Sequence, residues 1–195
     1  VHNILTSPGP LYRVQGWAEP IEATALGISE AQKAVINDDR LARALDAIAS
    51  EKARGIWFHL ALRTIKEWRL AIERVHHDTT SVSFFGEYET SVADPRITQG
   101  HSKNHRPDLK QLVFGLNVTD DGAVPLLHQV FSGNATDDSL HKDNFDRLRR
   151  LLGRSDFIYV ADCKLATESN MAHLASFDAK FVTVLPRSRR EDREF

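Results

Sequence analysis

Residues 75–84 form a run rich in β-branched and aromatic side chains, and Gly86 follows it. Such side chains favour extended structure, so we predict a strand here. Asp78 is the only Asp, Glu, Lys or Arg in the run. We interpret the strand as largely buried, where a carboxylate costs free energy unless a partner such as a bound cation compensates its charge.

A second apolar run, residues 157–161, ends at Asp162. We predict that the two strands lie side by side and that Asp78 and Asp162 share metal ions. Taken singly, a hydrogen-bonded strand carboxylate at Asp78 and a turn or helix cap at Asp162 are the ordinary roles of such residues. Taken together, the two acids suggest two-metal phosphoryl transfer, because hard cations prefer oxygen ligands.

The remaining pattern predicts the element order β-β-β-α-β-α-β. Asp120-Asp121-Gly122 indicates a hairpin, and Pro125 favours an edge position for the strand that follows. Gly153 is placed to end the first helix. Three meandering strands followed by crossover units predict an α/β fold, with a mixed sheet and helices on its faces. The predicted strands are 75–84, 112–118, 124–131, 157–161 and 180–185, and the helices run to residues 152 and 177.

We predict three regions along the chain. Residues 1–73 are an irregular lead-in and a helical N-terminal region, 74–186 an incomplete catalytic core, and 187–195 a charged tail. Ser29 and Gln32 form a capping-box pattern, and Asn37 or Asp38 can cap the next helix. A third helix carries an apolar stripe, which we interpret as core packing: Ile56, Leu60, Ile65 and Trp68.

Composition excludes some classes of protein. The 42% hydrophobic and 27% charged residues are ordinary for a globular chain. The formal net charge of −2 means that any DNA contact must come from local patches. The single cysteine, Cys163, excludes an internal disulfide and fits a reducing compartment. No apolar run has the length of a membrane span. Because Val1 opens the chain and Met171 is its only methionine, we expect a piece of a longer protein.

Residues 100–112 make the strongest local cationic patch before the tail. Pro107 cannot donate a sheet hydrogen bond, so this segment is predicted to be a loop or the entry to a strand. Its basic side chains either bind phosphates or solvate the loop. The basic residues are Lys103, Arg106 and Lys110, with His101 and His105 among them.

Four segments resemble a known family. His77-Asp78-Thr79-Thr80-Ser81-Val82 resembles the first-aspartate motif of bacterial insertion-sequence DDE transposases of the insertion-sequence-four group. Residues 100–112, GHSKNHRPDLKQL, closely resemble their Gly-Tyr-Ser-Lys-x-His-Arg-Pro-Asp-Leu-Lys-Gln block. Residues 132–137 resemble their Gly-Asn-x-x-Asp turn, and residues 160–162 their second-aspartate strand. The resemblance covers residues 25–190, approximately.

The resemblance implies a ribonuclease H-like fold and cut-and-paste cleavage and joining of DNA. It implies Mg²⁺ or Mn²⁺, with two ions in the complete enzyme, and DNA as the partner. A homodimer in a synaptic complex and a bacterial cytoplasmic location, with no membrane, belong to the same expectation. Asp78 and Asp162 would be catalytic residues and metal ligands, the first two of an acidic triad. The implied DNA contacts are Lys103, His105, Arg106 and Lys110.

The chain departs from the family pattern in three places. Cys163-Lys164 follows the second aspartate, where Arg-Gly or a similar pair is usual, and His101 replaces a tyrosine. The family's glutamate lies in a Tyr-x₂-Arg-x₃-Glu-x₆-Lys pattern that does not occur here. Glu191 and Glu194 lack that context and are not assigned. We therefore expect the fragment alone to be catalytically incomplete.

Two other functional hypotheses stay open. One is a phosphohydrolase that uses Asp78 as nucleophile, although Thr80 stands where such enzymes usually have a second acid. The other is a non-catalytic DNA-binding remnant of a transposase, which the missing glutamate supports. In either case His76 and His77 cannot both join Asp78 on one metal, because adjacent strand residues point to opposite faces.

Overall fold

The computed structural model describes residues 1–50, 55–88, 95–101 and 105–186. The chain divides into two compact units, Val1–Ile56 and Trp57–Phe195. We describe each unit by itself. The boundary predicted at residue 73 remains a prediction.

The N-terminal unit is made of short helices: α1 (His2–Thr6), α2 (Val14–Ala18), α3 (Glu30–Lys33) and α4 (Asp38–Ala49). The predicted caps are present. Ser29 and Gln32 form a capping box on α3, and the Asn37 side chain accepts a hydrogen bond from the backbone N–H of Arg40 at the start of α4. Among its described residues, only Ala18 and Ala23 are buried apolar side chains.

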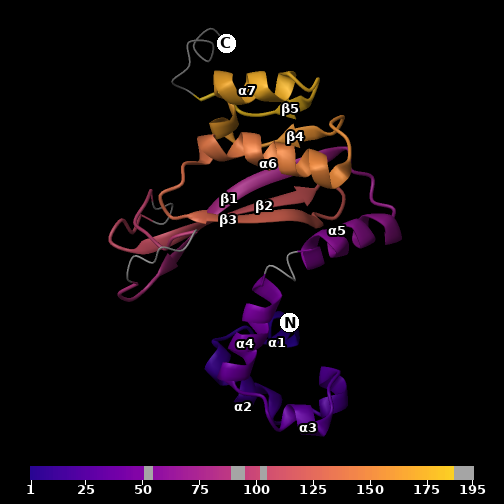
Figure 1. Cartoon of the computed structure of the whole chain (residues 1–195), viewed down its shortest axis with the longest axis vertical. Coiled ribbons are helices and arrows are strands. Elements are labelled where there is room, and N and C mark those ends of the chain that lie inside the picture. The colour runs from indigo at the N-terminus through magenta and orange to yellow at the C-terminus, as the bar shows by residue number, and fades with distance from the viewer. Residues whose placement is uncertain (51–54, 89–94, 102–104, 187–195) are drawn as a thin grey trace. The chain divides into compact units, whose positions relative to one another are not determined.

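The second unit is built on a five-stranded mixed sheet (Figure 1). Its strands are β1 (Arg74–Phe84), β2 (Lys110–Thr119), β3 (Pro125–Ser132), β4 (Ile158–Val160) and β5 (Lys180–Val182). In the order β3-β2-β1-β4-β5, β1 pairs antiparallel with β2, and β2 with β3. β4 pairs parallel with both β1 and β5. This is the ribonuclease H-like arrangement, so the predicted fold class is confirmed, with β1 beside β4.

Alternation along β1 gives the sheet two different faces. Odd-numbered residues from Val75 to Ser81 are buried, while the even-numbered residues from Arg74 to Val82 are exposed. The buried face packs against α6 (Asp137–Leu152) and α7 (Glu168–Ala175). Gly153 ends α6 at φ 66°, as predicted. The core includes Phe145 and Leu148 of α6, Leu174 of α7, and Phe157 and Tyr159 beside and within β4.

Helix α5 (Gly55–Glu67) reaches the edge strand through Trp57. The indole Nε1–H donates to the carbonyl oxygen of Leu126 at 3.0 Å, and the ring lies edge-on to His128 at 4.8 Å. The predicted core stripe of this helix is largely wrong. Ile65 packs against the core, but Trp68 is 75% exposed and Leu60 54% exposed, because no described element covers that side of the helix.

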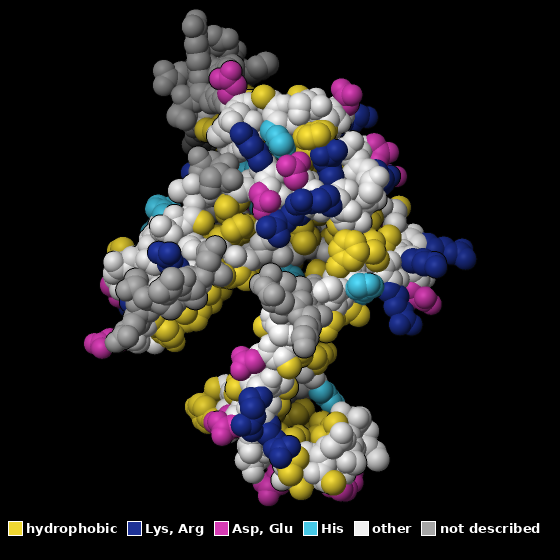
Figure 2. All heavy atoms as spheres, viewed as in Figure 1, with side chains coloured by type: hydrophobic (Ala, Val, Ile, Leu, Met, Phe, Trp, Pro, Cys, Tyr) yellow, Lys and Arg dark blue, Asp and Glu magenta, His cyan; other side chains and the backbone are white. Residues whose placement is uncertain are grey.

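Charged side chains of both signs are interspersed over the α6–α7 face (Figure 2). Arg147 pairs with Asp143 one turn away, and Arg149 lies 3.6 Å from Asp146. None of the described helices is both long enough and apolar enough to cross a membrane.

Candidate active site

Asp78 lies in β1, and Asp162 follows the end of the neighbouring parallel strand β4. His76 pairs with Val160 in the β1–β4 register, and each aspartate comes two residues later along its strand direction. Both aspartates line one depression of about 380 Å³. The structure therefore brings the two acids together, as their spacing in the predicted sheet requires.

The depression has an apolar lining around its polar groups. Leu116 is the register partner of Asp78 on β2, so its side chain points to the same side of the sheet. The other lining residues are His76, His77, Val118, Val160 and Ala161.

Asp78 is exposed, which corrects the expectation of a buried strand carboxylate. It occupies an even position of β1 and faces away from α6 and α7, so desolvation does not require a cation to compensate it. Its Oδ1 accepts a hydrogen bond from the backbone N–H of Thr79 at 2.7 Å. This bond holds one edge of the carboxylate close to the strand.

Asp162 is also exposed and caps the short helical turn Cys163–Leu165. Its Oδ1 accepts from the backbone N–H of Lys164 at 3.0 Å, and its carbonyl oxygen accepts from the hydroxyl of Thr183 at 2.6 Å. The capping role considered for this residue is therefore present. Within the described residues no hydrogen bond engages its Oδ2, so capping leaves an oxygen available for another ligand.

The donor set fits a hard divalent cation. Mg²⁺ commonly uses one or two protein carboxylates and completes its coordination with water and substrate phosphates. Asp78 and Asp162 supply two carboxylates to one depression. Among the described residues, no three His, Cys, Asp or Glu side chains converge in a way that could hold a metal ion.

His77 lies behind the site, on the opposite face of β1. It is 5% exposed, stacks on Tyr159 at 6.0 Å and meets His141 edge-on at 5.5 Å. Burial, with the charge of neighbouring His141 as a smaller cause, lowers the pKa of His77 to about 4. Burial also raises the pKa of Tyr159. His77 is therefore a neutral packed side chain at pH 7, and the prediction that His76 and His77 face opposite sides is confirmed.

The predicted DNA-contact residues are only partly described, because Lys103 lies outside the described residues. His105 is exposed and takes a left-handed backbone conformation with φ 56°. Arg106 binds the carboxylate of Asp108 with two hydrogen bonds, at 2.8 and 2.6 Å, which lower the pKa of that carboxyl. The Lys110 ammonium donates to the carbonyl oxygen of Tyr88.

Gly100 and Gly133, which belong to two of the motif segments, lie against each other, a contact that the sequence analysis did not predict. The buried Gln111 side chain donates to the carbonyl oxygens of Gly133 at 2.8 Å and His101 at 3.2 Å. A Cβ atom on Gly100 would lie 1.8 Å from the Gly133 carbonyl oxygen. The backbone at Gly100 and the Gln111 side chain therefore pack directly against Gly133, the residue after β3.

No family model matches the chain, and no curated protein matches it. Solved transposase structures are similar to it. The paired-end complex of Mos1 transposase with the left transposon end has a TM-score of 0.40 and 11% identity, covering 93% of this chain and 61% of that one. The catalytic domain of Mos1 mariner transposase has a TM-score of 0.39 and 12% identity, covering 71% of this chain and 64% of that one. A piggyBac transposase synaptic complex with hairpin DNA has a TM-score of 0.44 and 11% identity, covering 73% of this chain and 31% of that one. The chain spans less than two thirds of each.

Proposed function

We propose that this chain carries part of the catalytic core of a DDE transposase of the insertion-sequence-four group, which cleaves and joins DNA strands. One observation carries the proposal: Asp78 and Asp162, from adjacent parallel strands, line the same depression. The resemblance of the segments around both aspartates to the family motifs supports it.

In this proposal Asp78 and Asp162 would hold Mg²⁺ or Mn²⁺, with two ions in the complete enzyme. When bound, such ions activate the attacking hydroxyl and stabilise the leaving 3′ oxygen. The chain's own part is to fix the ligands. The backbone N–H groups of Thr79 and Lys164 each bind one carboxylate oxygen and so orient the two carboxylates.

DNA is the proposed partner, with Lys103, His105, Arg106 and Lys110 as its contacts. Lys110 is the register partner of Phe84, which shares the face of β1 that carries Asp78. Phe84 comes six positions after Asp78 along the strand, a distance of about 20 Å. A DNA segment lying along β1 would therefore reach both the acids and Lys110. The proposal also includes a homodimer on paired DNA ends and a bacterial cytoplasmic location.

A phosphohydrolase with Asp78 as nucleophile is less well supported. Such enzymes prefer a parallel sheet, whereas β1 pairs antiparallel with β2 on one side. Thr80, not an acid, follows on the same face. Trapping of a phosphate analogue on Asp78 would favour this alternative.

Manganese binding tests the proposal directly. We expect the wild-type chain to bind Mn²⁺ in a calorimetric titration and Asp78→Asn or Asp162→Asn to weaken that binding at least about tenfold, because each removes a charged ligand. Asp121→Asn is the matched control, since Asp121 is an exposed acid in the β2–β3 turn.

Equal affinities in all four proteins, or no Mn²⁺ binding by the wild type, would contradict the proposed site. A non-catalytic DNA-binding remnant predicts that second result, together with retained DNA binding.

A further inference from the structure

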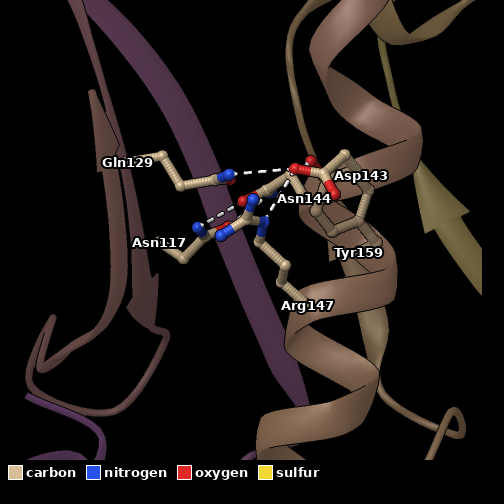
Figure 3. Close-up of polar contacts among 6 residues, drawn as sticks. All are labelled: Asn117, Gln129, Asp143, Asn144, Arg147 and Tyr159. Carbon is tan, nitrogen blue, oxygen red and sulfur yellow. Dashed lines mark hydrogen bonds and ion pairs between the residues drawn. The ribbon is translucent and has the colours of Figure 1, made fainter. Parts of the chain in front are cut away.

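A buried polar network joins α6 to the strands on either side of β1 (Figure 3). Asn117 of β2 and Asn144 of α6 exchange two side-chain hydrogen bonds, each 2.8 Å long. The Asn144 amide also donates to the hydroxyl of Tyr159 in β4 at 2.8 Å. All three side chains are fully buried. Asn144 thus connects β2 to β4 across the strand between them.

The network passes directly behind the two acids. His77, the residue before Asp78, is the register partner of Asn117, and its ring stacks on Tyr159. Tyr159 in turn lies three residues before Asp162. The hydroxyl of Tyr159 also lies 3.1 Å from Nδ1 of His141. The contacts therefore involve all three strands that surround the depression.

Such a network specifies one arrangement of these strands. Buried amides and hydroxyls are costly when they lose their partners, so a lateral shift of β4 or of α6 would break several hydrogen bonds together. An apolar interface would tolerate small shifts, because apolar contacts have little directional preference. The reciprocal amide pair and the Tyr159 hydroxyl restrict that freedom.

We infer that Asn117, Asn144 and Tyr159 are positioning residues, which fix β4 against β1 and thereby hold Asp78 and Asp162 at the spacing that bound metal ions need. This inference rests on the proposed function. Ligating groups must be held to within a fraction of an ångström, and residues that support them act through the packing behind the site. None of the three side chains lines the depression itself.

The same helix provides a matched control contact. Gln129 of β3 donates to the Asp143 carboxylate at 3.1 Å, and Arg147 donates to the same oxygen at 2.7 Å (Figure 3). This contact also joins α6 to the sheet, but it involves the edge strand β3 and neither β1 nor β4. Gln129→Leu removes one part-buried hydrogen bond between α6 and the sheet, and Gln129 does not line the depression.

The test compares Tyr159→Phe and Asn144→Leu with Gln129→Leu in the full chain, at a temperature where circular dichroism shows each protein folded. We expect Mn²⁺ affinity to fall about tenfold in the first two variants, as for other groups that support metal ligands, and less than about twofold in the third. Tyr159→Phe keeps the buried ring and loses only the hydroxyl, so it is the variant best able to preserve the fold.

Amide hydrogen exchange of the metal-free proteins supplies a second, independent readout. The backbone N–H of Ile158 bonds to the carbonyl oxygen of Glu73, across β4 and β1. We expect Tyr159→Phe to speed exchange at this amide about tenfold relative to Gln129→Leu, because β4 is held less firmly. The same Mn²⁺ affinity and exchange rate in Tyr159→Phe and Gln129→Leu would overturn the inference. If the wild type binds no Mn²⁺, the proposed function fails, and the exchange rates alone decide whether the network positions β4.

Discussion

His77 and Asp78 are neighbours in β1 but meet opposite environments. The imidazole is 5% exposed beneath α6, whereas the carboxylate faces the open depression. The alternation of the strand produces this contrast, because successive side chains point to opposite faces. One face of the strand thus serves packing while the other carries the candidate chemistry.

The low pKa of His77 predicts a loss of stability in mild acid. The neutral imidazole is favoured in the folded chain, so its pKa falls from 6.5 to about 4, and the unfolded chain binds the proton more readily. The stabilisation is complete above pH 6.5 and decreases as pH falls from 6.5 to 4. The free energy of unfolding lost over this pH range is about 3 kcal/mol. Urea unfolding across this range measures it.

His77→Leu should flatten that part of the stability curve, since the variant has no imidazole to protonate at this position. His76→Gln is the control, because His76 lies on the exposed face of the same strand. An unaltered slope in His77→Leu would show that another group causes the acid sensitivity.

Sequence reasoning found the two acids because each ends or interrupts an apolar run. It failed on the burial of Asp78, since a run of β-branched residues does not reveal which face is covered. It also missed the pair Asn117 and Asn144, which bond to each other although they lie 27 residues apart in the chain. The available signal was Asn117 itself, an amide within the predicted strand 112–118, because an amide that becomes buried needs a hydrogen-bond partner.

The elements that were predicted well are those with local causes. Caps at Ser29 and Asn37 and the glycine at the end of α6 act within one turn of helix, so the sequence reveals them. The β2–β3 hairpin was also found, but positive φ occurs at Gly122 and Ala123, not at an aspartate. Thr119 closes that turn through two backbone contacts of its hydroxyl. The prediction that the apolar stripe of α5 packs in the core was largely wrong, because burial depends on elements that are distant in the sequence.

Two glycines at element ends should respond differently to alanine. At Gly133 a Cβ atom would lie 2.1 Å from the Gln111 carbonyl oxygen and 2.3 Å from that of Thr98, so backbone must move. We expect Gly133→Ala to cost about 3 kcal/mol, as severe overpacking does. At Gly153 no atom lies within 4 Å, and only the φ of 66° is unfavourable.

Gly153→Ala should therefore cost about 1 kcal/mol, from backbone strain alone. Urea unfolding followed by circular dichroism compares the two variants with the wild type. Equal losses of unfolding free energy in the two variants would mean that the backbone around Gly133 moves easily to accept a Cβ atom. The close contact between Gly100 and Gly133 would then not explain why glycine stands at these positions.

At the scale of the whole molecule, charge does not favour DNA. The formal net charge is −2, and the α6–α7 face in Figure 2 mixes both signs. In the proposed function, affinity for DNA must then come from a few cations placed along the DNA backbone. The block that holds Arg106 and Lys110 adjoins the β1–β2 ladder, on which Lys110 pairs with Phe84.

The salt dependence of DNA binding therefore tests whether this block makes the contacts. Each phosphate contact contributes about 0.9 to the slope of log affinity against log salt, so Arg106→Gln with Lys110→Gln should reduce the slope by about 2. Arg147→Gln is the matched control: both Arg106 and Arg147 have side chains 49% exposed and pair with a nearby aspartate. Fluorescence anisotropy with a labelled duplex at several salt concentrations measures the slopes. A block that only solvates its loop predicts the same slope for all three proteins, because an arginine that does not touch phosphate releases no counterions when DNA binds.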